Sequence, residues 1–131
     1  MAKHATGFTV IELVFVITIL GFASIVFFTQ KHSIEIISSN DTKKTSINAI
    51  YYSLEEVFYP ANQYYPRSVN SDVLKSVDPA VFTDPNGIII NATGSSYTYL
   101  PTNCIDDKCK SYTLKATLEN ENDFIKSNRN K

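Results

Sequence analysis

The side chains in this sequence that could do chemistry are few, and the most unusual of them lies near the beginning. Glu12 is the one carboxylate inside an apolar run over residues 8–28, and both histidines, His4 and His32, lie within the first 32 of 131 residues. A carboxylate at the centre of a bilayer costs about 2.5–3.5 kcal/mol on insertion scales, so Glu12 calls for a functional explanation. The remainder has no histidine and no nucleophile–base, phosphate-loop or zinc spacing. We therefore expect no enzyme activity, no catalytic residue, no resident metal and no cofactor.

The apolar run is long enough to cross a membrane as a helix. A span needs about 20 apolar residues, because each adds about 1.5 Å and the hydrocarbon is about 30 Å thick. One alternative is a conventional secretory signal with Lys3 at its start and cleavage after Ala23. The apolar residues that continue past Ala23, and the charge of Glu12 within the core, speak against it. An uncleaved anchor is the other alternative.

The residues around Glu12 form a contiguous motif, Gly7-Phe8-Thr9-Val10-Ile11-Glu12-Leu13. This motif closely resembles the prepilin signature of type IV pilins and type II secretion pseudopilins. The resemblance implies that residues 1–7 are a leader, that a prepilin peptidase cuts between Gly7 and Phe8, and that the new amine of Phe8 is methylated. Glu12 then becomes the fifth residue of the mature chain.

The resemblance also implies an assembly chemistry for Phe8 and Glu12. The ammonium of Phe8 in one copy can pair with the carboxylate of Glu12 in its neighbour, and a buried ion pair neutralises both charges only in one register. The implied partners are further pilin copies in a helical filament, the prepilin peptidase, the inner-membrane assembly machinery and the membrane itself. The implied location is the inner membrane as a single-pass precursor, then an extracellular pilus that serves adhesion, twitching motility or DNA uptake.

Two other functions remain open. The chain could be a pseudopilin of a type II secretion or competence system, or a membrane-anchored binding module that never polymerises. The net charge of −1 gives no electrostatic reason to expect a nucleic acid partner.

The predicted fold class is α+β, with one long N-terminal helix packed on a small antiparallel sheet, as in pilins. Residues 8–28 form the apolar half of the helix. Gly21 within it either lets neighbouring helices approach or, as the resemblance to pilins implies, marks a place where the helix unwinds on assembly. Residues 29–58 form an amphipathic half, weakened over residues 38–41 and ended by Tyr59-Pro60. Its apolar positions recur at helical spacing: Ile34, Ile37, Ile47, Ile50, Leu54, Val57 and Phe58. Its polar face is expected to hold Lys43, Lys44, Asn48, Glu55 and Glu56.

The head, residues 59–131, is expected to be a three- or four-stranded meander with strands near 87–90, 96–100 and 112–118. The tyrosines near the helix end pack on it with hydroxyls toward water. Cys104 and Cys109, which flank a connection over residues 105–108 between the last two strands, are expected to form one disulfide, as in exported domains. Residues 119–131 look loose. Three acids, Asp84, Asp106 and Asp107, are turn formers or calcium ligands, and two sequons place glycosylation at Asn40 or Asn91.

Overall fold

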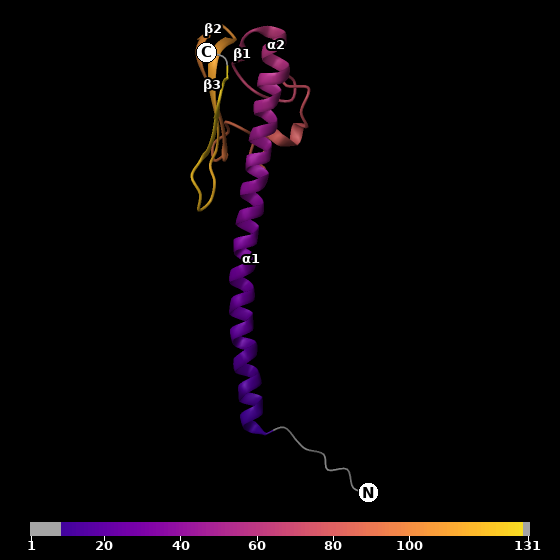
Figure 1. Cartoon of the computed structure of the whole chain (residues 1–131), viewed down its shortest axis with the longest axis vertical. Coiled ribbons are helices and arrows are strands. Elements are labelled where there is room, and N and C mark those ends of the chain that lie inside the picture. Colours follow the sequence, from indigo (N-terminus) through magenta and orange to yellow (C-terminus); the bar gives the residue numbers. More distant parts are fainter. Residues whose placement is uncertain (1–8, 130–131) are drawn as a thin grey trace. The chain divides into compact units, whose positions relative to one another are not determined.

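A computed structural model describes residues 9–129 of the chain (Figure 1). The chain divides into two compact units, one that ends at Ile36 and one that begins at Ile37. The helices are α1 (Val10–Tyr52), the π-helix η1 (Ser53–Phe58), α2 (Tyr59–Asn62) and the 3-10 helix η2 (Pro79–Phe82). The strands are β1 (Tyr65–Pro66), β2 (Tyr97–Ile105), β3 (Lys108–Ala116) and β4 (Phe124–Ser127). The predicted α+β class, a long apolar helix with a small antiparallel sheet, is confirmed.

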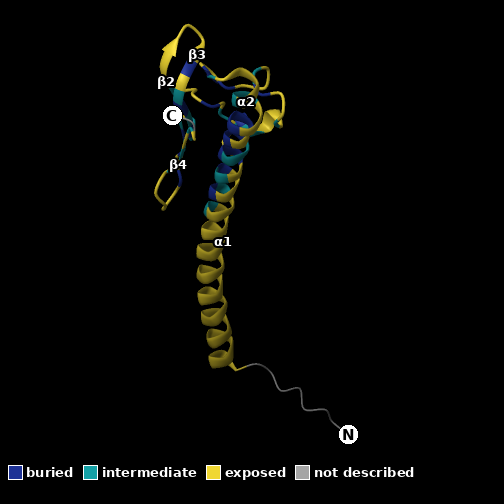
Figure 2. Ribbon diagram, turned by 45° about the horizontal axis from the view of Figure 1, so that its top comes forward, coloured by how far each residue is buried: buried dark blue, intermediate teal, exposed yellow. Residues whose placement is uncertain are grey.

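The described part of the first unit is a bare helix. Every side chain from residue 9 to residue 35 is exposed, and Figure 2 shows this part of α1 as exposed throughout. This is the part of the chain that is long and apolar enough to cross a membrane. Thr18 and Ser24 return their hydroxyls to the carbonyls of Val14 and Leu20, each at 2.8 Å, so these polar groups need no water.

The predicted weak patch at residues 38–41 neither kinks nor frays the helix. α1 runs through it without interruption, and Thr42 bonds its hydroxyl to the carbonyl of Ser38 at 2.9 Å. Asn40 is 1% exposed and makes long-range hydrogen bonds, described below. Tertiary contacts thus compensate for its weak helix propensity.

The helical run also passes the proline that was expected to end it. η1 precedes Pro60, and the amide of Tyr59 bonds five residues back to the carbonyl of Leu54. A proline ring collides with the carbonyl four residues earlier, and the wider π turn relieves that collision. The helix ends at Gln63, whose φ of 63° gives a left-handed cap.

The sheet of the second unit is built around β3. Strand β2 pairs with it along one edge, while β1 and β4 pair with it along the other, all antiparallel. The last three strands form an antiparallel meander as predicted, but β4 lies in the tail that was expected to be loose. The predicted strand at residues 87–90 is wrong: only one bridge joins Thr83 and Ile89 there, because the neighbouring backbone groups bond within the loop.

The core lies between the second half of the helix and the sheet. Ile47, Ile50 and Leu54 are fully buried, so the amphipathic face is confirmed there, but Ile34, Ile37 and Val57 are exposed. The sheet contributes mainly tyrosines: Tyr65, Tyr97, Tyr99 and Tyr112 are each at most 1% exposed. The expectation that the tyrosine hydroxyls face water is wrong for Tyr65, because its hydroxyl finds an acceptor inside.

Candidate functional site

The N-terminal motif is described only from Thr9 onward. Gly7 and Phe8, the predicted cleavage and methylation sites, lie outside the described residues. Glu12 lies in the first turn of α1, where the helix dipole favours a negative charge, and its side chain is exposed. The amide of Glu12 donates to Oγ1 of Thr9 at 3.3 Å. The sequence signal for this cap, a threonine followed three residues later by a glutamate, is a capping box that the sequence analysis did not use.

Gly21 is also bare. Apart from the neighbouring residues and the backbone of its own helix, no heavy atom of the described structure comes within 4 Å of the position that a Cβ would occupy on it. The helix is continuous through this glycine. Its role in the close approach of neighbouring helices stays a prediction.

Inside the second unit, Glu55 of η1 is a buried acid that sequence periodicity had placed on the polar face. Its side chain is 5% exposed, and it accepts the hydroxyls of Tyr65 at 3.2 Å and Tyr112 at 2.8 Å. Burial, and then the contact with Glu55, raise the pKa of Tyr112 far above its ordinary value. The two hydroxyls donate hydrogen bonds to the buried carboxylate, which apolar surroundings alone could not provide.

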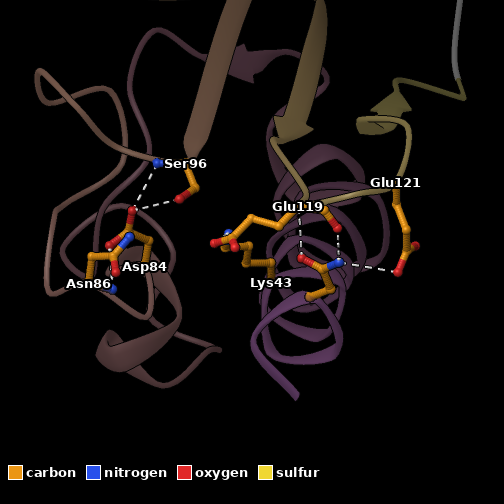
Figure 3. Close-up of polar contacts among 7 residues, drawn as sticks. Lys43, Asp84, Asn86, Ser96, Glu119 and Glu121 are labelled. Carbon is orange, nitrogen blue, oxygen red and sulfur yellow. Dashed lines mark hydrogen bonds and ion pairs between the residues drawn. The ribbon is translucent and has the colours of Figure 1, made fainter. Parts of the chain in front are cut away.

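The segment after β3 is fastened to the helix and is not loose over residues 119–129, which corrects the expectation for the tail as far as it is described. Asn40 donates to the carbonyl of Glu119 at 2.8 Å and accepts its amide at 3.0 Å, and also reaches Glu121 at 3.2 Å. Lys43, 3% exposed, faces the carboxylate of Glu119 at 3.9 Å, as Figure 3 shows. Lys44 pairs with Glu121 and, through its hydrogen bond, lowers the pKa of that acid.

The same segment returns along the helix to its end. Strand β4 pairs with β3, and Arg129 beyond it donates to the hydroxyl of Tyr51 at 2.9 Å and pairs with Glu56. The reason the sequence did not predict this is distance along the chain, since the partners lie 73 to 81 residues apart.

Asp84, which the sequence predicted to be either a turn former or a calcium ligand, is a turn former. One oxygen accepts the amides of Asn86 and Ile88, each at 2.9 Å, and the other accepts the amide and hydroxyl of Ser96 at 2.8 and 2.9 Å (Figure 3). Both oxygens are therefore engaged by the protein itself. Burial alone would raise the pKa of Asp84, but these hydrogen bonds outweigh it and the pKa is lowered.

The asparagines of the two glycosylation sequons, Asn40 and Asn91, both have structural roles. Asn40 is too deeply buried to leave room for a glycan. Asn91 has a left-handed φ of 65°, and its side-chain amide pairs with Tyr99 like a strand residue, accepting its amide at 2.8 Å and donating to its carbonyl at 3.0 Å. Pro101, two residues after Tyr99 in β2, has no backbone N–H that could donate a hydrogen bond. Together they close the free edge of β2 to strand addition.

The predicted disulfide between Cys104 and Cys109 is present, but its setting differs from the prediction. The two cysteines do not flank a loop between strands; they lie opposite each other within β2 and β3. Only Asp106 and Asp107 form the turn between these strands. The bond therefore fastens the last pairs of a hairpin that is already held by a ladder.

Among known proteins, no family model, no curated protein and no solved structure matches this chain. The functional conclusion must therefore come from the residues themselves.

Proposed function

We propose that the chain is the precursor of a type IV pilin, a structural subunit that assembles from the membrane into an extracellular filament. The filament would serve adhesion, twitching motility or DNA uptake. The observation that carries the proposal is the contiguous motif from Gly7 to Leu13, whose last four residues are the first turn of a bare apolar helix.

The exposed apolar helix supports the proposal, because its side chains require cover by lipid or by other copies of the chain. Monomeric soluble proteins rarely expose apolar patches larger than a few hundred Å², yet here the apolar side chains from Val10 to Phe28 are between 43% and 80% exposed. Lipid can cover them while the subunit waits, and the same helices of other copies can cover them in a filament. The second unit has a core of its own and needs no such cover.

Glu12 supports a pairing role for the first turn. Its carboxylate is near the dipole's positive end, which lowers its cost in lipid only in part. The amine of Phe8 from an adjacent copy supplies the missing cation. Breaking such a buried pair costs about 3–5 kcal/mol, which is more than a hundredfold in an association constant.

The test is Glu12→Ala in the native host. We expect the precursor to be processed as in the wild type, while the chain almost disappears from the sheared extracellular fraction. Glu35→Ala is the matched control, because it removes the same charge from an exposed ion pair with Lys31 on the same helix. Normal filaments from Glu12→Ala would contradict the pairing scheme.

The same sheared fraction separates the other functions. A pseudopilin would remain with the cell envelope at natural expression levels, and a binding module would appear only as single chains. Recovery of the wild-type chain in fibres supports the pilus, and its absence from fibres would refute it.

A further inference from the structure

Three hollows on the second unit join into one groove. The first, of about 560 Å³, shares Tyr64 and Asp107 with the second, of about 440 Å³. The second shares Phe58 and Val73 with the third, of about 470 Å³. We call this continuous surface the hairpin groove, because it starts at the β2–β3 turn and ends beside η1 and α2. Figure 1 shows that turn and α2 at the same end of the unit.

The floor of the groove is apolar and partly aromatic. Phe58 and Tyr64 meet edge to face with ring centres 5.7 Å apart, and both remain partly exposed. Val57 and Ile105, which line its two ends, are 52% and 72% exposed. Rings of this kind present flat apolar faces on which the C–H face of a sugar ring can stack.

The rim of the groove is basic in a chain that is slightly acidic. Four cations line it, Arg67, Lys75, Lys108 and Lys110, against two acids, Asp106 and Asp107. The groove thus carries +2 while the whole chain carries −1. This local excess favours an anionic ligand over a neutral one.

Two of these cations are already oriented by the structure. Arg67 donates one guanidinium hydrogen to the carbonyl of Asp106 at 3.1 Å, which leaves its other donors for a ligand. The amine of Lys108 lies 5.2 Å from the ring centre of Tyr64, so charge and stacking face occur together. A guanidinium held in this way can bind a carboxylate with two parallel hydrogen bonds.

The remaining polar side chains of the groove distinguish the class of polymer. Amides and carboxylates line it as well, in Gln63, Asn103, Asp106 and Asp107. These groups exchange hydrogen bonds with sugar hydroxyls. A polysaccharide carries such hydroxyls on every ring, whereas the backbone of a DNA strand carries phosphates and no free hydroxyl, so the carboxylates of Asp106 and Asp107 favour the sugar polymer.

We propose that the hairpin groove binds an acidic polysaccharide, whose sugar rings stack on Phe58 and Tyr64 and whose carboxylates pair with Arg67 and Lys108. This site goes beyond the proposed filament function and does not depend on polymerisation. A filament would present many copies of it, so that weak single sites add up to avid attachment.

The experiment measures binding of a fluorescent galacturonic acid oligomer to the full chain in detergent, by titration. We expect saturable binding, weakened about tenfold or more by Arg67→Ala with Lys108→Ala. Tyr64→Ala should weaken it as well. The charge-matched control is Lys31→Ala with Lys115→Ala, two cations outside the groove, and Tyr52→Ala controls for loss of an exposed ring. Both controls should bind as the wild type does.

Other outcomes overturn the proposal. No binding of the oligomer, or equal loss in groove and control variants, would show that the groove is not a site for it. A neutral maltose oligomer that bound as well would remove the role of charge, and an oligo-dT strand that bound more tightly would make nucleic acid the occupant. Because all four groove cations are exposed, Lys108→Glu with Lys110→Glu gives a second variant should the first unfold. It should abolish binding.

Discussion

At the scale of single residues, this protein relies on a few buried polar side chains that replace regular structure. Asp84 takes four hydrogen bonds and holds a loop in which three consecutive isoleucines would otherwise favour a strand. Glu55 does the equivalent for two tyrosines inside the core. Both acids act through hydrogen bonds, and the loss of either acid removes an acceptor from buried donors.

Asp84→Asn should lower the free energy of unfolding by about 2–3 kcal/mol at neutral pH, because an amide cannot accept from both sides. The folded state holds the pKa of Asp84 below 3.8, so its stabilisation is present above that pH and is lost as the pH falls. The difference between wild type and variant should therefore shrink as the pH falls below 3.8 and through the lowered pKa of the folded state. Urea unfolding followed by tyrosine fluorescence measures it. Asp72→Asn, an exposed acid of the same region, is the control and should change little.

Glu55→Ala should cost about 3 kcal/mol, since it leaves the hydroxyls of Tyr65 and Tyr112 without this acceptor. Glu56→Ala is the neighbouring control: its exposed pair with Arg129 is worth at most about 1 kcal/mol. Thermal unfolding compares the two. Equal losses would mean that the buried hydrogen bonds contribute nothing special.

At the scale of elements, side chains of the helix hold the C-terminal segment in place through hydrogen bonds and ion pairs. Asn40 reproduces with its side chain the donor and acceptor of a strand neighbour, and so fixes where residues 119–121 begin their return. From there β4 joins the sheet and Arg129 reaches the helix end. The helix thus serves as one edge of the head as well as its support.

Asn40→Ala should loosen this segment before the rest of the unit unfolds. We expect a loss of about 2 kcal/mol and faster amide exchange in β4, because two backbone groups of Glu119 lose their partner. Thr45→Ala, at an exposed position of the same helix, is the control. Amide hydrogen exchange, measured by mass spectrometry on the segment that contains residues 124–127, tests this expectation. Unchanged exchange there would show that β4 is held by the sheet alone.

At the scale of the whole molecule, the two units are stable in different environments. The described part of the first unit has no core of its own, and its side chains are exposed and mostly apolar. The second has a core of aliphatic side chains and tyrosines, further fastened by a disulfide. A helix of the first kind is stable in lipid or among its own copies, and the second kind folds in water.

The mass of the exported chain tests this division together with the proposed processing. Cleavage after Gly7 removes seven residues and leaves a methylated Phe8, whereas cleavage after Ala23 removes twenty-three and most of the bare helix. We expect the first mass, measured on the intact protein from the cell surface. Gly7→Leu is the companion variant and should leave the leader in place, because a larger side chain there alters the motif at the cut. A first residue other than Phe8 would contradict the prepilin proposal.

The sequence by itself determined what depends on local pattern. The long apolar run, the amphipathic turns around Ile47 and Ile50, the turn at Asp84 and the cysteine pair were all recognisable, because period, length and turn chemistry are properties of neighbouring residues. Only the tertiary structure decided the rest. Asn40, Lys43 and Glu55 are buried because their partners lie elsewhere in the chain, and the helix passes Pro60 because a π turn makes room for it. Such pairings form only when distant segments meet, and no local pattern contains them.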